Sequence, residues 1–329
     1  MTKKWIWLFV AATFLAGLAA YGLRENAPVA LERVVVTDVN QVISALMYIA
    51  SAEGYFHKEG LSVEFLRQSS GKESIKAVLE GKADIATSTD SPLAVALMAG
   101  NPIKIFTSIH ASDKTDAIAA LRDKSIAKPA DLIGKRIGMI PGTSSELFLK
   151  LFLTDKRLLE KDITIVPLEA DKLVDALTAG SIDAMSGWQS LRLKADKSLP
   201  GKLETFFCSE GLFTTSWALS ARADFLTARP ETTQKFLRAL LAAESFAIKN
   251  HPQAVQIVAK HTNLPLDDVD RLWEKGAFNV RLDQALLLSL ESSIKSKQPA
   301  AGGTRPDVLA AFYWDALKTV NSSRVTLIH

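Results

Sequence analysis

Short runs of apolar, β-branched residues alternate along the chain with longer segments whose apolar residues recur every three or four positions. Residues 33–37 form the first short run, and residues 42–50 carry apolar side chains at helical spacing. The short runs predict strands, and the longer periodic segments predict helices. The same order continues through residues 61–106, so the pattern predicts an α/β fold with helices on both faces of a sheet.

The pattern starts again near residue 129, which predicts a second lobe of similar construction. Both halves contain a strand, a helix, a glycine and then a short strand with an aspartate, at residues 79–86 and again at 177–184. We therefore expect residues 32–118 to form the first part of lobe 1 and residues 119–213 to form lobe 2. Residues 214–329 would return to lobe 1 and add C-terminal helices.

The first 26 residues have the features of an export signal. Lys3 and Lys4 precede the apolar run 5–20, which is typical of a signal peptide with a cleavage site near residue 22. The alternative is an uncleaved anchor in the inner membrane formed by residues 5–23. In both cases residues 1–26 place the remainder outside the inner membrane, so we expect a periplasmic protein, either free or anchored.

Composition excludes several other classes of protein. The 329 residues include 48% hydrophobic residues, one Cys, and 39 Lys and Arg against 36 Asp and Glu, for a net charge of +3. Such a chain can bury a large core but cannot form an internal disulfide. The balanced charge gives no basic stripe for nucleic acid. The five histidines lack paired metal-ligand spacing, and no serine-hydrolase motif occurs, so we expect no metal, no cofactor and no catalytic residues.

Four segments in a fixed order carry a family resemblance, namely residues 53–64, 81–85, 91–96 and 128–138. Together they resemble the periplasmic solute-binding proteins of ABC importers for sulfonates, taurine and nitrate, a group that includes thiamine-pyrimidine binding proteins. The resemblance implies a type II periplasmic-binding fold of two lobes, each a mixed sheet flanked by helices, joined by two hinge strands. A small solute would bind between the lobes, which would close on it.

The resemblance also implies partners. We expect a monomer that is not an enzyme and that delivers a small anionic or zwitterionic solute to an ABC importer permease. Two alternatives remain open at this stage: a membrane-anchored, sensor-like binding module, and an enzyme of the same fold acting on a pyrimidine or menaquinone precursor.

The first candidate site is a hydroxyl-rich helix entry in lobe 2. Free backbone N–H groups, hydroxyls and the positive end of a helix dipole would converge there on an anion. The alternative is ordinary helix capping. The residues concerned are Gly142, Thr143, Ser144 and Ser145.

Candidates in lobe 1 follow two predicted strand ends. Asn40 and Gln41 could contact a solute through their amides, unless this segment only caps a helix. Ser88 and Thr89 form a second hydroxyl-rich entry. The adjoining Asp90 either caps a helix or binds an ammonium group on the solute.

Two further candidates complete the predicted site. Trp188 would cover the end of the solute opposite its anionic group, or else pack against its own lobe. Thr215 lies where the chain is predicted to return to lobe 1, near the hinge.

Overall fold

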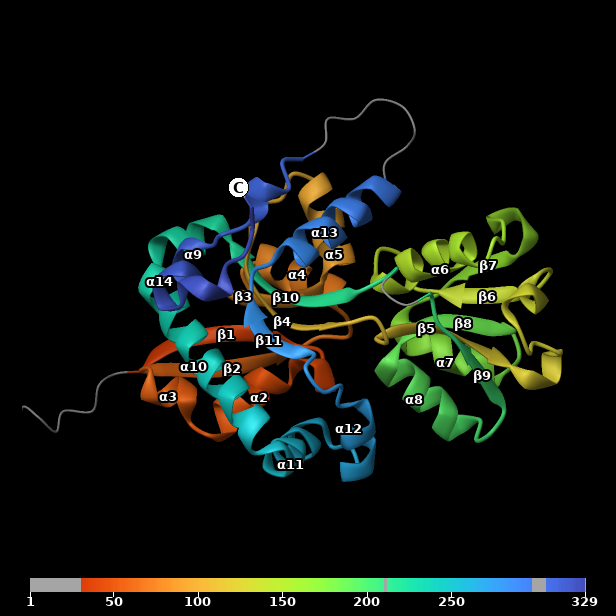
Figure 1. Ribbon diagram of the computed structural model, residues 1–329, viewed down its shortest axis with the longest axis horizontal. Helices are drawn as coiled ribbons and strands as arrows, with labels where there is room; N and C mark the ends of the chain where they lie inside the picture. The colour runs from red at the N-terminus through yellow and green to blue at the C-terminus, as the bar shows by residue number, and fades with distance from the viewer. Residues whose placement is uncertain (1–30, 210–211, 298–305, 329) are drawn as a thin grey trace, which may run out of the picture.

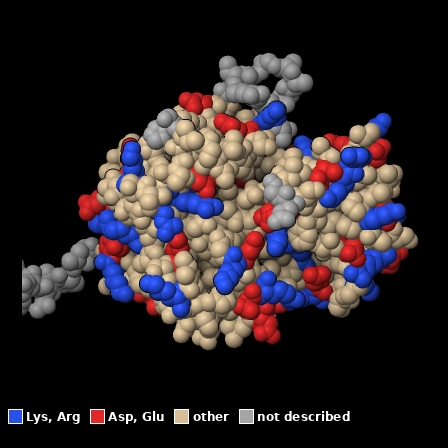
Figure 2. All heavy atoms as spheres, viewed as in Figure 1, with Lys and Arg blue, Asp and Glu red and all other residues tan. Residues whose placement is uncertain are grey.

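A computed structural model describes residues 31–209, 212–297 and 306–328. The predicted signal or anchor, residues 1–26, lies outside these residues. The described chain forms two lobes, each built on its own sheet (Figure 1). None of the described helices is long and apolar enough to cross a membrane. On the face seen in Figure 2, basic and acidic side chains are intermingled over both lobes.

Lobe 1 contains a six-stranded mixed sheet with the order β11-β4-β10-β3-β1-β2. Strand β1 pairs in parallel with β2 and β3, and β10 runs antiparallel to both β3 and β4. The strands are β1 (Glu32–Asp38), β2 (Leu61–Arg67), β3 (Ile85–Thr89), β4 (Ile103–Ser112), β10 (Thr215–Arg222) and β11 (Phe278–Arg281).

Lobe 2 contains a five-stranded mixed sheet with the order β7-β6-β8-β5-β9. Strand β6 pairs in parallel with β7 and β8, whereas β5 runs antiparallel to β8 and β9. The strands are β5 (Asp116–Leu121), β6 (Arg136–Met139), β7 (Thr164–Pro167), β8 (Ala184–Trp188) and β9 (Leu203–Phe206). The predicted α/β class, with a mixed sheet in each lobe, is confirmed.

Helices cover both sheets and bury separate apolar cores. The core of lobe 1 includes Phe106 and Phe236, and that of lobe 2 includes Phe148 and Phe152, all fully buried. The helices of lobe 1 are α2 (Ala45–Ala52), α3 (Tyr55–Lys58), α4 (Gly71–Leu79), α5 (Asp90–Met98), α9 (Ala223–Ala228), α10 (Pro230–Lys249), α11 (His251–Thr262), α12 (Leu266–Leu272), α13 (Gln284–Lys297) and α14 (Asp315–Val320). Those of lobe 2 are α6 (Ser144–Asp155), α7 (Ala170–Thr178) and α8 (Gln189–Ser198).

The chain passes between the two sheets twice. It leaves lobe 1 between the end of β4 at Ser112 and the start of β5 at Asp116. It returns between the end of β9 at Phe206 and the start of β10 at Thr215. The two connections lie together, because Thr215 pairs with Ser112 in the register of β10 and β4. Two adjacent crossings allow one lobe to rotate against the other.

The aspartate of the repeated unit has the same structural role in both lobes. The Asp84 carboxylate accepts a hydrogen bond of 2.8 Å from the Val35 amide, and the Asp183 carboxylate accepts one of 2.9 Å from the Arg136 amide. In each lobe the preceding helix ends at a glycine with positive φ, +72° at Gly81 and +69° at Gly180. A left-handed glycine ends the helix, and the aspartate then ties the next strand to the neighbouring parallel strand, β1 in lobe 1 and β6 in lobe 2.

Candidate functional site

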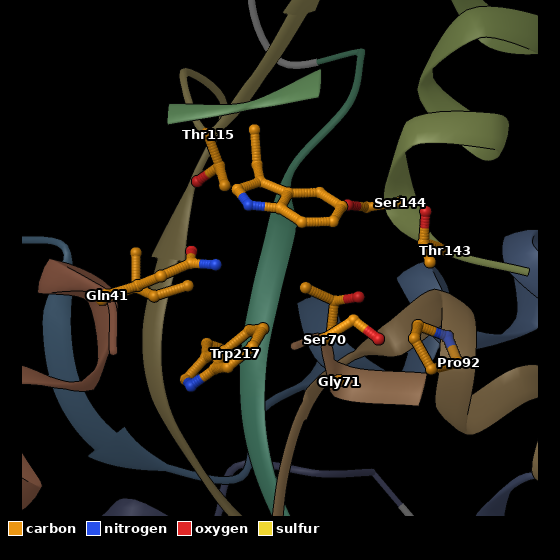
Figure 3. Close-up of a pocket in the computed structure, with 11 residues that line it drawn as sticks. Gln41, Ser70, Gly71, Pro92, Thr115, Thr143, Ser144 and Trp217 are labelled. Carbon is orange, nitrogen blue, oxygen red and sulfur yellow. The ribbon is translucent and has the colours of Figure 1, made fainter. Parts of the chain in front are cut away.

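A small cavity lies between the two lobes, at the ends of strands from both sheets. Its volume of about 20 Å³ has room for only one or two water molecules, so the lobes are closed on each other. Figure 3 shows Gln41 on one side of this cavity, Thr143 and Ser144 of α6 on the other, and Trp217 between them. The lining residues are Gln41, Ile43, Ser70, Gly71, Thr89, Pro92, Thr115, Thr143, Ser144, Trp188 and Trp217.

Three helices begin at the cavity wall. Ser70 is the N-cap of α4 and accepts a hydrogen bond of 3.3 Å from the Glu73 amide. Thr89 is the N-cap of α5, and Thr143 is the N-cap of α6. Each N-terminus carries about +0.5 elementary charge and amides without a helical partner. The described lining contains no Lys, Arg, Asp or Glu, and the amides of these helix ends favour an anion. Two buried carboxyl groups lie next to the lining: Asp90, the first residue of α5, and Asp116, which contacts Ser144.

A glycine allows α4 to reach the cavity. A Cβ atom added to Gly71 would lie 2.8 Å from the Cβ of Ser88 and 2.9 Å from its Cα. The start of α4 therefore packs directly on the backbone of β3, and a larger residue at this position would push the helix away.

Two buried polar atoms of the lining have no protein partner in the described chain. They are the indole Nε1 of Trp217 and the hydroxyl of Thr115, in residues that are 4% and 2% exposed. A buried donor without a partner costs about 1–3 kcal/mol. A bound solute with acceptor oxygens would satisfy the Trp217 N–H.

Gln41 lines the cavity, but its predicted companion Asn40 does not. Asn40 has a left-handed backbone, with φ of +54°, and its side chain donates to the Thr262 carbonyl at 3.3 Å. The Gln41 amide donates to the Tyr48 hydroxyl at 3.2 Å, and that hydroxyl donates to Asp38 at 2.5 Å. The amide side chain of Gln41 thus projects from a fixed backbone.

The predicted hydroxyls of lobe 2 have partners inside the protein. Thr143 and Ser144 line the cavity, but the Thr143 hydroxyl donates to the Ile140 carbonyl at 2.7 Å. The Ser145 hydroxyl donates to the Ser186 carbonyl at 2.8 Å. The Ser144 hydroxyl donates to the Asp116 carboxylate at 2.9 Å. The hydroxyl hydrogens of this wall are therefore already donated to partners inside the protein.

Gly142 lies just outside the lining. It has a φ of +76°, and its amide donates to the Glu146 carboxylate at 2.8 Å. It borders a neighbouring groove with Pro141, against α4 and α5. Its structural role is the turn that starts α6.

Asp90 and Thr215 also lie behind the cavity wall. The fully buried Asp90 begins α5 and accepts hydrogen bonds from the Ser91 amide, at 2.9 Å, and from the Ser289 hydroxyl. Burial is the main reason that its pKa is raised to about 7. The Thr215 hydroxyl donates to Asp116 at 2.8 Å. Asp90 is the first residue of α5 and not its N-cap, which is Thr89. Ser88 is buried too, with a hydroxyl that has no partner in the described chain.

Trp188 lies both at the cavity and in the core of its own lobe. It lines the cavity and also packs in the apolar core of lobe 2, where it is 8% exposed. Sequence reasoning missed Ser70, Gly71, Thr115 and Trp217. The hydroxyl-rich entry at Ser69–Gly71 after a strand was a usable signal. Trp217 lies inside a buried strand and gave none.

Comparison with known proteins places the chain in a family. A family model described as NMT1/THI5 like matches residues 41–255, which is more than half of the chain. The chain belongs to the NMT1/THI5-like family. The resemblance found in the sequence is thereby confirmed.

Individual relatives of this NMT1/THI5-like protein are similar to it in sequence or in fold. The taurine-binding periplasmic protein of Escherichia coli is 28% identical over 79% of this chain and 81% of its own length. The alkanesulfonate-binding protein SsuA from Xanthomonas axonopodis, bound to MOPS, superposes with a TM-score of 0.73 at 20% identity, over 87% of this chain and 98% of SsuA. The desulfurization enzyme DSZB has a TM-score of 0.64 at 14% identity, over 89% and 99% of the two chains. The fold therefore occurs in binding proteins and in at least one enzyme.

Proposed function

We propose that this protein is an extracytoplasmic solute-binding protein that captures a small anionic or zwitterionic solute and delivers it to an ABC importer permease. The observation that carries the proposal is the cavity between closed lobes, where three helix N-termini meet without a charged side chain in the described lining. Backbone amides and the helix dipoles suit a sulfonate-, taurine- or nitrate-like group. The unpartnered indole N–H of Trp217 adds a further donor.

Contacts between the lobes support capture by closure. The Ser91 hydroxyl of α5 donates to the Thr143 carbonyl of α6 across the cleft, at 3.0 Å. Lys197 of α8 forms an ion pair with Asp268 of α12 at another edge of the interface. A solute bound between the lobes would strengthen the closed state, because it contacts both walls at once.

The relatives support the rest of the proposal. Their names describe periplasmic proteins that bind taurine or alkanesulfonates. On this basis the present chain acts in the periplasm, free or anchored, with an importer permease as its partner. The site would comprise Gln41, Thr89, Thr143, Ser144 and Trp188 from the predicted set, together with Ser70, Gly71, Thr115 and Trp217.

Chemical groups that an enzyme would need are poorly placed in the described chain. Burial raises the pKa of the Cys208 thiol to about 12, so it is not a thiolate at neutral pH. Burial also lowers the pKa of His110 to about 3. Among the described residues, no three His, Cys, Asp or Glu side chains form a group that could hold a metal. These features favour binding over catalysis.

A binding screen tests the proposal. The purified protein is titrated calorimetrically with taurine, ethanesulfonate, propionate and nitrate, with choline as a cationic control. We expect saturable binding of at least one anionic or zwitterionic compound, and a thermal stabilisation equivalent to about 2.7 kcal/mol at a concentration 100 times Kd. Binding of choline alone, or of no anion in the panel, would reject the proposal.

A further inference from the structure

A carboxylate lies directly behind the cavity wall, at the first crossing between the lobes. Asp116 is fully buried at the start of β5. One of its oxygens accepts the Ser144 hydroxyl at 2.9 Å, and the other accepts the Thr215 hydroxyl at 2.8 Å. Asp116 therefore joins the start of α6 to the hinge strand β10.

This contact determines what Ser144 can offer a solute. A serine hydroxyl has one hydrogen and two lone pairs. The hydrogen of Ser144 is used by Asp116, so only acceptor lone pairs remain for the cavity. The hydroxyl hydrogens of Thr143 and Ser145 are also used within lobe 2. The hydroxyls of this wall therefore accept hydrogen bonds rather than donate them.

The charge of Asp116 acts in the same direction at the cavity surface. Burial raises the pKa of Asp116, while its hydrogen bonds with Thr215 and Ser144 and the charge of Arg192 favour the ionised form. When ionised, Asp116 carries a full negative charge, which exceeds the roughly +0.5 at the start of α6. Arg192 donates to the carbonyls of Lys114, Thr115 and Gly187 and borders a separate outer groove. Asp90, the first residue of α5 in lobe 1, adds negative charge at the start of that helix when ionised.

The opposite wall has the complementary chemistry. The N-terminus of α4 presents backbone amides and positive potential, and the N–H of Trp217 has no protein partner in the described chain. The cavity is thus polarised, with acceptors at Ser144 and donors at Ser70, Gly71 and Trp217.

We propose that Asp116 is a positioning residue that makes the cleft select a zwitterionic solute and fixes its orientation. Through Ser144 it places an acceptor, backed by a negative charge, against the ammonium end of the solute. The anionic end lies against the start of α4 and Trp217. This inference rests on the proposed function, and it reverses the orientation expected from the sequence, in which the anion lies at Thr143–Ser145.

The test compares two probes of similar shape. Taurine carries an ammonium group, and ethanesulfonate has a methyl group in its place. We expect the wild-type protein to bind taurine at least tenfold more tightly in calorimetric titrations. Asp116→Asn removes the charge and keeps one acceptor oxygen, while an NH2 donor replaces the other. We expect it to reduce the taurine-to-ethanesulfonate affinity ratio at least fivefold, with ethanesulfonate affinity unchanged or higher.

A matched control tests whether an effect of Asp116→Asn comes from the charge beside the cavity or from the change in net charge. Asp171→Asn removes the same charge from the exposed start of α7 in lobe 2, where the Asp171 side chain is 69% exposed. We expect the ratio to stay at its wild-type value in this variant. Urea denaturation checks that both variants are folded.

The outcomes distinguish this inference from the proposed function. Equal losses of affinity for both probes in Asp116→Asn would mean that Asp116 only stabilises the hinge, and would overturn the inference. Wild-type binding of ethanesulfonate as tight as that of taurine would overturn it as well, while the proposed function stands. Binding of neither probe, nor of any other anion, would overturn both. If Asp116→Asn does not fold, Ser144→Ala provides the same comparison, and there too a selective loss of taurine is expected.

Discussion

In lobe 1, the strand after Asp84 ends at Thr89 and leads directly into α5. The matching strand of lobe 2 follows Asp183 and ends at Trp188, which leads into α8. The two strands have the same place in their sheets, since Ile85 pairs with Val36 of β1 and Ala184 pairs with Ile137 of β6. One unit therefore ends in a small hydroxyl residue and the other in a large aromatic one.

The difference extends to the helix that precedes each strand. In lobe 1, α4 starts at Ser70 and Gly71 on the cavity wall. In lobe 2, the corresponding helix α7 follows the exposed Glu169, which lies outside the cavity lining and forms no side-chain cap. The same architecture thus supplies donors from lobe 1 and an aromatic cover with occupied hydroxyls from lobe 2. The occupied hydroxyls of lobe 2 and the helix start at Ser70 and Gly71 in lobe 1, rather than the fold, decide which wall can bind an anion.

Gly71→Ala is expected to have the largest effect on the difference between the two walls. The added Cβ would lie 2.8 Å from the Ser88 Cβ and 2.9 Å from its backbone Cα. The start of α4 must then move, so we expect solute affinity to fall about 100-fold and the free energy of unfolding to fall by about 2 kcal/mol. Calorimetric titration and urea denaturation measure the two effects.

Gly187→Ala is the control in lobe 2. Gly187 occupies the position in β8 that Ser88 has in β3, and a Cβ there would make ordinary contacts of 3.6 Å. We expect affinity within about threefold of the wild type. Similar losses in both variants would mean that close packing of α4 has no special role in the site.

A second prediction compares the aspartates of the repeated unit. Asp183 accepts hydrogen bonds from the Arg136 amide and guanidinium, with a shortest charged contact of 2.8 Å, whereas Asp84 accepts one from the Val35 amide. Charged hydrogen bonds are stronger than neutral ones. We expect Asp183→Ala to lower the free energy of unfolding by about 2 kcal/mol and Asp84→Ala by about 1 kcal/mol, measured in urea.

The stability contribution of Asp183 can also be tested by its pH dependence. Hydrogen bonds with Arg136 lower the pKa of Asp183 below its ordinary value of 3.8. A carboxyl with a lowered pKa in the folded state stabilises the protein above its unfolded pKa and loses this effect as pH falls through the folded value. The stability difference between wild type and Asp183→Asn should therefore shrink below pH 3.8. A difference that persisted unchanged at about pH 3 would contradict this assignment.

The free indole N–H of lobe 1 provides a third, smaller prediction. Trp217→Phe removes the donor and keeps an aromatic ring in β10. We expect anion affinity to fall about tenfold, equivalent to about 1.4 kcal/mol, while the stability of the solute-free protein changes little, because an unpartnered buried donor is lost. Trp188→Phe, which alters the aromatic cover of lobe 2, should cost less anion affinity. A larger loss in Trp188→Phe would reverse the assigned roles of the two walls.

The comparison also shows what sequence could predict. Hydrophobic periodicity predicted the order of strands and helices, and the repeated aspartate unit predicted two similar lobes, because both depend on local spacing. Trp188 and the entry at Thr143 were found because they follow strand ends. Thr115 lies in the connection between β4 and β5. Trp217 lies on β10, where the direction of each side chain is set by pairing with the distant strands β3 and β4. The use of the Ser144 hydroxyl by Asp116 depends on a contact 28 residues apart, which no local pattern reveals.

The smallest expected effect concerns the edge of the cleft rather than its walls. Lys197 of lobe 2 pairs with Asp268 of lobe 1, and the lysine side chain is 48% exposed. Exposed ion pairs contribute about 0.2–1 kcal/mol, so we expect Lys197→Met to weaken solute binding two- to fivefold without changing the preference between taurine and ethanesulfonate.

Arg271→Met is the control, since Arg271 pairs with Asp268 inside lobe 1, at 2.5 Å. Small-angle scattering of the solute-free protein should show a wider average separation of the lobes for Lys197→Met and not for Arg271→Met. Equal scattering from the two variants would mean that closure depends on the cavity walls alone, and that the ion pair between Lys197 and Asp268 does not stabilise the closed state.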